Sequence, residues 1–124
     1  MIITLPLPPT DNRRLIFARY QGRMVSSTEY RRWFENCEIK WIVEYRDLKP
    51  LKPSFENQIT IPYKLYQKDK RSDIQNYEKS LKDFLSKRLY SDDKYIKLDL
   101  ILPVTIDKAN PRVEIDFGCK LEIN

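Results

Sequence analysis

The sequence predicts an α+β fold, in which one mixed β-sheet of about four to six strands is covered by two helices, at about residues 27–45 and 73–89. Two observations support this prediction. Strand-like segments come first and last in the chain, and a helix-like segment falls between strand-like segments twice. The 124 residues contain no linker, repeat or low-complexity tract, so we expect residues 1–124 to form a single domain.

The chain begins with a strand-like segment, Ile2–Leu7, that runs into three prolines. Since proline has no amide hydrogen to donate, this strand should stop or lie at a sheet edge. After a polar loop, Leu15–Tyr20 and Arg23–Ser26 flank Gly22, which can supply the positive φ of a hairpin turn. The arginines of this region are open to two interpretations, ordinary surface solvation or contact with phosphates.

The first helix has a capping-box signature, with Ser26 as the N-cap and Glu29 three residues later, and should run to about Tyr45. Apolar residues recur along it at helical spacing, which predicts one buried stripe. Because these aromatic residues share one side, they indicate core packing and not a platform for stacking bases. The stripe consists of Tyr30, Trp33, Phe34, Cys37, Trp41, Ile42 and Tyr45.

The remaining strands follow from alternation of apolar and polar residues. Phe55–Tyr66 alternates partly, and Pro62 within it favours an edge position or a bulge. Tyr95–Val104 is a second such segment. After a turn at Asp107–Pro111, Arg112–Phe117 should pair back on it as a hairpin.

The second helix carries the most concentrated polar chemistry. Ser72 or Asp73 can act as its N-cap, and apolar residues recur behind it as far as Leu89. Asp73, Asn76 and Lys79 are spaced three apart, so their side chains can gather on the polar face. A second acidic pair, Asp92–Asp93, lies just beyond. Two interpretations fit: a solvated, well-capped helix, or a metal-dependent phosphodiester site.

Composition narrows the function classes. Lys and Arg number 23 against 18 Asp and Glu, which gives a net charge of +5, so nucleic acid or another anionic surface is an open partner. The absence of histidine excludes histidine triads and histidine-ligated zinc. Cys37 and Cys119 are far apart and outside any CxxC pattern, so we expect buried free thiols. No apolar run approaches the roughly 20 residues of a spanning helix, and we expect a cytoplasmic protein with no membrane partner.

Three motifs resemble the RusA family of Holliday junction resolvases, in that family's order. The resemblance covers about Ile3 to Phe117. Its residues are Leu5–Asn12 with Gly22–Arg23, Ser26 and Tyr30–Arg31; then Ser72–Asn76 with Lys79, similar to an Asp–x–Asp–Asn–x–x–Lys helix opening; then Leu89–Asp93.

The resemblance implies a RusA-like fold, and a bacterial or phage-encoded homodimer that nicks opposed strands of a four-way DNA junction during recombination and repair. It implies magnesium, or manganese in its place, and no small-molecule cofactor. By position, the resemblance makes Asp73 and Asp93 the metal-binding and catalytic acids. It makes Lys79 the catalytic basic residue beside the scissile phosphate, and Asn76 the Asn of the helix motif.

One position departs from the family pattern. Gln75 stands where the family usually has Asp, so a neutral amide oxygen replaces a charged metal ligand and the affinity for magnesium should fall. Three hypotheses follow: an active junction endonuclease, a junction-binding protein of the same fold with weakened catalysis, and a basic scaffold domain. The residues that we expect to contact DNA are Arg13, Arg14, Arg23, Lys68, Lys70, Arg71 and Asn76.

Overall fold

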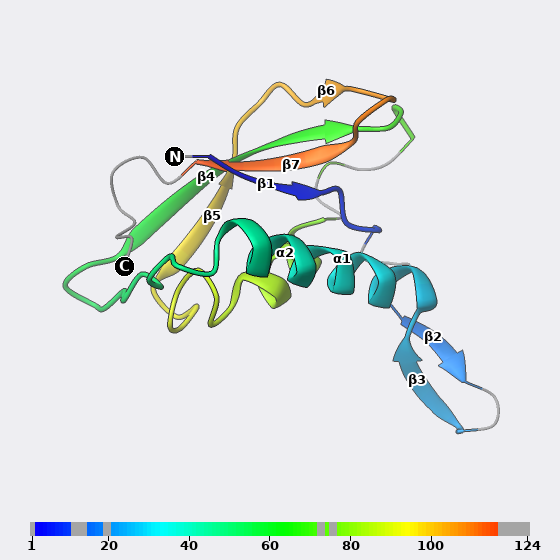
Figure 1. The fold of residues 1–124 in the computed structure, drawn as a ribbon, viewed down its shortest axis with the longest axis horizontal. Coiled ribbons are helices and arrows are strands. Elements are labelled where there is room, and N and C mark those ends of the chain that lie inside the picture. Colours follow the sequence, from blue (N-terminus) through cyan, green and yellow to red (C-terminus); the bar gives the residue numbers. More distant parts are fainter. Residues whose placement is uncertain (1, 11–14, 19–20, 72–73, 75–76, 117–124) are drawn as a thin grey trace.

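The computed structural model describes residues 2–10, 15–18, 21–71, 74 and 77–116, and it confirms the predicted α+β fold (Figure 1). A five-stranded mixed sheet and a separate two-stranded sheet accompany two helices. Both helices cover the same face of the larger sheet. The elements are β1 (Ile2–Pro6), β2 (Leu15–Ala18), β3 (Arg23–Ser26), α1 (Thr28–Glu44), β4 (Ile59–Gln67), α2 (Glu78–Leu85), β5 (Ile96–Leu100), β6 (Thr105–Ile106) and β7 (Arg112–Asp116).

The larger sheet has the order β1-β7-β4-β5, and β6 also pairs with β4. β7 is antiparallel to both β1 and β4, whereas β5 is parallel to β4. The predicted hairpin between Tyr95–Val104 and Arg112–Phe117 is therefore wrong. Because α2 carries the chain back between β4 and β5, these two strands enter the sheet in the same direction. β5 thus occupies the side of β4 that β7 does not.

β4 lies inside the sheet, so the edge position that Pro62 suggested is also wrong. Pro62 aligns with Asp99 of β5, but the pairing with β7 begins only at Tyr63. Pro62, which has no amide hydrogen, therefore lies just outside the β4–β7 ladder, where no hydrogen bond between these two strands is lost. Alternate residues of β4, from Ile59 to Gln67, are buried on the face toward the helices.

The hairpin prediction near the N-terminus is confirmed. β2 and β3 pair antiparallel, and Gly22 between them has φ +63°, the left-handed conformation that glycine adopts freely. Ser26 is the last residue of β3 and not the helix cap. Ser27 takes that role, and its Oγ accepts a 3.0 Å hydrogen bond from the amide of Tyr30.

α1 buries most of the predicted stripe. Trp33, Cys37 and Trp41 are buried, but Ile42 is 58 % exposed, so its place in the stripe is wrong. Ile42 is five residues beyond Cys37, which turns it about 140° away around the helix. Burial raises the pKa of the Cys37 thiol to about 12, as expected for a buried free thiol. Cys119 lies outside the described residues.

α2 is shorter than predicted at both ends. It begins at Glu78 after Tyr77, which makes no capping hydrogen bond with its side chain, so neither Ser72 nor Asp73 is its N-cap. Tyr77 is only 3 % exposed, and its burial fixes this end by packing. At the other end Lys87 has φ +68°, a left-handed conformation that ends the helix. Leu89 follows this reversal and still reaches the core, with no exposed surface.

The core lies between the helices and the larger sheet. It includes Ile3 and Leu5 of β1, Ile61 and Leu65 of β4, Val113 and Ile115 of β7, and Leu81, Phe84 and Leu85 of α2. No helix among the described residues is long and apolar enough to cross a membrane.

α1 also satisfies the free edge of the sheet. The Tyr45 hydroxyl accepts a 3.1 Å hydrogen bond from the amide of Thr4, and the Trp33 indole Nε1 donates at 2.8 Å to the carbonyl oxygen of Pro6. Both backbone groups belong to β1, the edge strand. Backbone groups that are paired in this way cannot take up a further strand.

We predict that Tyr45→Phe lowers the free energy of unfolding by about 1 kcal/mol, because the Thr4 amide loses its acceptor. Urea denaturation followed by circular dichroism measures the change. Tyr95→Phe is the matched control, since its ring packs on Phe55 outside this edge. Equal stability of Tyr45→Phe and the unsubstituted protein would show that the hydroxyl contributes nothing to the edge.

Candidate active site

Two loops and the first turn of α2 carry the described part of the predicted site. The first loop follows β4 and holds Lys68, Lys70 and Arg71, all exposed. Asp69 stands among them, and its Oδ1 accepts a 2.9 Å hydrogen bond from the amide of Arg71. This local bond fixes a turn. The three cations therefore extend into solvent from a defined backbone bend at the end of β4.

Several predicted site residues lie outside the described residues: Asp73, Gln75, Asn76, Arg13 and Arg14. Their roles stay predictions. Of the described residues next to them in sequence, Ile74 is half-buried and Tyr77 is buried.

Lys79 lies in the first turn of α2 and is exposed, next to the fully buried Ser80. Among the described residues no ion pair holds Lys79. Its ammonium group is thus available to an anion that approaches this end of the helix.

The second loop, between α2 and β5, holds Asp92 and Asp93. The Oδ1 atom of Asp92 accepts a 3.1 Å hydrogen bond from the amide of Lys94, which ties that carboxylate into a turn. Asp93 is exposed, and its backbone carbonyl accepts from the amide of Ile96 at 3.3 Å. The predicted catalytic acid is therefore the one of the pair that contributes its backbone carbonyl, and not its carboxylate, to these local hydrogen bonds.

A buried anchor holds this loop in place. Tyr90 has no exposed surface, and its hydroxyl donates to the carbonyl oxygen of Lys82 at 3.4 Å. Two backbone hydrogen bonds join the same segment to Leu51. The Leu51 amide donates to the Leu89 carbonyl oxygen at 2.7 Å, and the Ser91 amide donates to the Leu51 carbonyl oxygen at 2.9 Å. Asp93 is only three residues from Tyr90, so its position depends on this anchor.

Asp83 is a further exposed acid, on α2, and the sequence argument missed it. Burial raises the pKa of the Tyr90 hydroxyl well above its usual value, and the charges of Asp93 and Asp83 raise it further. Both carboxylates therefore act on one hydroxyl. Asp83 is four residues after Lys79, which places the two on one side of α2, and that spacing was visible in the sequence.

The donor chemistry fits magnesium, although the described residues do not complete a site. Carboxylate oxygens are the hard ligands that magnesium prefers. Within the described ranges there is no group of three Asp, Glu, Cys or His side chains that could hold a metal ion. A set of three such ligands would therefore need residues outside the described ranges, where Asp73 and Gln75 lie.

The parallel arrangement of β4 and β5 limits how that set can assemble. The basic loop leaves the last residue of β4, whereas Asp93 precedes β5, whose first residue aligns with Ile59, the first of β4. The two loops therefore start at opposite ends of this strand pair, and α2, about 12 Å long, runs between them. A shared site requires the segment before α2 to approach the Asp93 loop along the side of this helix.

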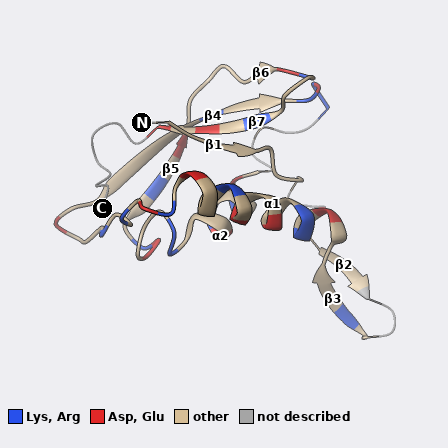
Figure 2. Cartoon of the chain, in the orientation of Figure 1, with Lys and Arg blue, Asp and Glu red and all other residues tan. Residues whose placement is uncertain are grey.

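The described cations that were predicted to contact DNA lie away from the Asp93 loop. Arg23 is exposed on β3, and its Nε donates to the Gln21 side chain at 3.3 Å. Figure 2 shows this hairpin and the basic loop after β4 on the same side of the view, with the loop between α2 and β5 on the opposite side. The predicted DNA contacts are thus spread over two projecting segments of the molecule.

These features place the protein among small basic α+β domains with exposed cations and carboxylates on their loops. The model of the family Endodeoxyribonuclease RusA matches residues 6–117, nearly the whole chain. The chain therefore belongs to the RusA endodeoxyribonuclease family, as its motifs predicted. No curated protein matches the chain.

One buried side-chain amide at the end of β4 has no hydrogen-bond acceptor within the part of the chain that the structure describes. Gln67, the last residue of β4, is 3 % exposed, and its Nε2 has no acceptor among the described residues. We predict that Gln67→Met raises the free energy of unfolding by about 1 kcal/mol, since a buried unsatisfied donor costs about 1–3 kcal/mol. Urea denaturation measures the change.

Gln58→Met is the matched control for this prediction, because Gln58 is exposed and its Nε2 already donates to the Phe55 carbonyl oxygen. A loss of stability in Gln67→Met alone would contradict the prediction and would show that the amide has an acceptor in solution.

Proposed function

We propose that this protein is a magnesium-dependent endonuclease that resolves four-way DNA junctions by paired nicks, as a homodimer. The observation that carries the proposal is the match of the RusA endodeoxyribonuclease family to residues 6–117. The charge balance of +5 agrees with a polyanionic substrate. The exposed Lys68, Lys70 and Arg71 on the turn after β4, with Arg23 on the hairpin, supply cations for backbone phosphates.

The residues proposed to hold the metal are Asp73, Asp93 and Gln75. Magnesium or manganese, when bound there, supplies Lewis acidity toward the phosphate and lowers the pKa of water. Lys79 places a positive charge at the start of α2, where it stabilises the charge that develops on the phosphate during cleavage. The Tyr90 anchor and the Asp92 turn fix the backbone from which Asp93 projects.

Gln75 favours a second candidate function, a junction-binding protein of the same fold whose catalysis is weakened. A neutral amide removes one negative charge from the metal site, so metal affinity falls while repulsion of DNA also falls. Binding without cleavage is the expected phenotype of this alternative.

For the nuclease, we predict that Asp93→Asn lowers cleavage of a synthetic four-way junction by at least about 100-fold, since even residues that only support a metal ligand are worth roughly 10- to 100-fold. Junction binding should persist, because a negative charge facing DNA is lost. Gel electrophoresis of labelled junctions measures cleavage, and gel shift in chelator measures binding.

Asp92→Asn is the matched control for Asp93→Asn. It is the adjacent acid, also exposed, and Asn can still accept the hydrogen bond from Lys94. Its cleavage should stay within about threefold of the unsubstituted protein. Equal losses in the two variants would refute the assignment of Asp93 to the site.

The two candidate functions differ in their response to Gln75→Asp. If the unsubstituted protein cuts junctions in magnesium and not in chelator, the nuclease is supported, and Gln75→Asp should cut at lower magnesium concentration. If only Gln75→Asp cuts, the binding protein with lapsed catalysis is correct. Absence of junction cleavage by both, together with no preference for junctions over linear duplex at low salt, contradicts both candidates and leaves the basic scaffold domain.

A further inference from the structure

The β6–β7 turn, residues 107–111, crosses the end of β4. Tyr66 of β4 aligns with a residue of β6 and also with a residue of β7, so these two strands lie on opposite sides of β4. The chain between them must therefore pass over the end of that strand. The Asp107 amide donates a 2.7 Å hydrogen bond to the Gln67 carbonyl oxygen, which places the turn beside the basic loop that follows β4.

The side chain of Arg112 holds the β6–β7 turn against the sheet. Its Nη1 atom donates to the Oδ2 atom of Asp107 at 2.7 Å and to the carbonyl oxygen of Asn110 at 3.0 Å. Its Nε atom donates to Glu114 at 3.1 Å, and its guanidinium lies 3.8 Å from the centre of the Tyr66 ring. The side chain is only 20 % exposed, and two carboxylates offset its charge. Arg112 thus joins β4, β7 and the turn.

Asp107 closes the turn from within. Its Oδ1 atom accepts a 3.2 Å hydrogen bond from the amide of Asn110, while its Oδ2 atom accepts the bond from Arg112. The hydrogen bond from Arg112 lowers the pKa of Asp107, so this carboxylate stays charged at neutral pH. Both of its oxygens are therefore engaged inside the turn.

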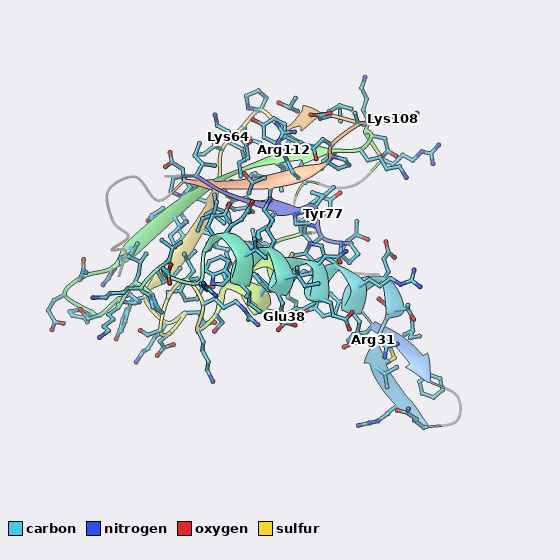
Figure 3. All side chains as sticks on the ribbon, in the orientation of Figure 1. Arg31, Glu38, Lys64, Tyr77, Lys108 and Arg112 are labelled. Carbon is cyan, nitrogen blue, oxygen red and sulfur yellow. The ribbon has the colours of Figure 1, made fainter. Side chains whose placement is uncertain are left out.

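Exposed cations project from the same end of the sheet. Figure 3 shows Lys108 at the outer tip of this end, with Arg112 farther in along β7. The two acids here, Asp69 and Asp107, accept hydrogen bonds within their own turns. Within the ranges that the structure describes, no ion pair holds any of the exposed cations. These cations are Lys68, Lys70, Arg71 and Lys108. This end of the sheet therefore directs positive charge outward.

We propose that the β6–β7 turn is a further contact for the phosphate backbone of DNA, in which Lys108 binds a phosphate and Asp107 and Arg112 act as positioning residues. The inference rests on the proposed function for its substrate and adds a contact outside the cleavage site. A lysine ammonium binds phosphate as a point charge and reads no base sequence. A side chain on a turn that is already fixed loses less freedom when it binds.

The contact should act on binding and not on the chemical step. The loop that holds Asp93 precedes β5, whose first residue aligns with the first residue of β4, whereas the β6–β7 turn lies at the last. The phosphate bound by Lys108 is therefore not the one that is cut. Its effect should appear in affinity and in the dependence of affinity on salt.

Fluorescence anisotropy of a labelled four-way junction, measured in chelator so that nothing is cut, tests the contact. Lys108→Ala should weaken binding by about threefold, as expected for one exposed ion pair. It should also reduce the slope of log affinity against log salt concentration by about one.

Lys64→Ala is the matched control for Lys108→Ala. Lys64 is also exposed, but it lies within β4 on the sheet face opposite the helices (Figure 3). Its loss should leave affinity and slope unchanged. Equal losses in the two variants would show a general effect of charge, and a loss in Lys64→Ala alone would place DNA on the open face of the sheet. Either result, or an unchanged Lys108→Ala, overturns the proposal.

Asp107→Ala distinguishes a positioned turn from a surface that is merely charged. Loss of an acid should by charge alone tighten the binding of a polyanion. If the bond between Asp107 and Arg112 positions Lys108, binding should instead weaken by about twofold, and it should not weaken further when Lys108→Ala is already present. Glu56→Ala, at an exposed acid before β4, is the control and should not weaken binding. Tighter binding in Asp107→Ala refutes the positioning role.

The cleavage readout separates this contact from the nuclease itself. With saturating protein in magnesium, Lys108→Ala should cut at the rate of the unsubstituted protein. A protein whose junction affinity depends on Lys108 but that never cuts supports the contact and refutes the nuclease. A protein that cuts, with an affinity that does not depend on Lys108, refutes the contact while the nuclease stands. Absence of binding to junction and duplex alike at low salt also refutes the contact.

Discussion

The packing of the Phe84 ring against α1 is the contact on which the arrangement of both helices depends. Phe84 has no exposed surface, and its ring centroid lies 5.2 Å from that of Phe34 and 6.0 Å from those of Trp33 and Trp41. Arg88 covers the Phe84 ring at 4.4 Å and approaches Glu38 of α1 at 3.4 Å. Since Trp33 also bonds to β1, one aromatic cluster joins α2, α1 and the sheet edge.

The packing of this aromatic cluster fixes the position of the candidate site. α2 is only eight residues long, and a helix of that length is marginal in water without tertiary packing. Phe84 and Tyr77 supply that packing near its two ends, so Lys79 is held between two buried rings. The Asp93 loop is fixed in the same way, by Tyr90 against α2. Rigid anchors thus stand directly behind the exposed groups that are proposed to meet DNA.

Local patterns in the sequence predicted the helices and most strands, whereas neighbours in space were harder to predict. Spacing of four identified Trp33, Cys37 and Trp41, and Gly22 identified the hairpin. The N-cap of α2 was misplaced because a good capping residue at Ser72 or Asp73 was outweighed by the burial of Tyr77. The helix between β4 and β5 could have predicted that these two strands are parallel. The alternation of apolar and polar residues suggested instead that residues 95–104 and 112–117 form a hairpin. For the site, the position of Asp93 just beyond the second helix followed from sequence. That Asp83 and Asp93 both act on the Tyr90 hydroxyl depends on how the fold buries Tyr90.

Gln75 shows how charge in such a site acts on two affinities in opposite directions. A site with three carboxylates binds a divalent cation more tightly, but without the cation it repels a polyanion more strongly. Replacing one carboxylate by an amide keeps an oxygen ligand and removes one charge, so metal affinity falls and DNA affinity in the absence of metal rises. The Asp93 and Asp83 carboxylates both act on Tyr90, so they add negative charge around this hydroxyl. The proposed site can therefore retain much of its attraction for magnesium only if the segment before α2 reaches these two acids, and the geometry of that segment decides between cleavage and binding.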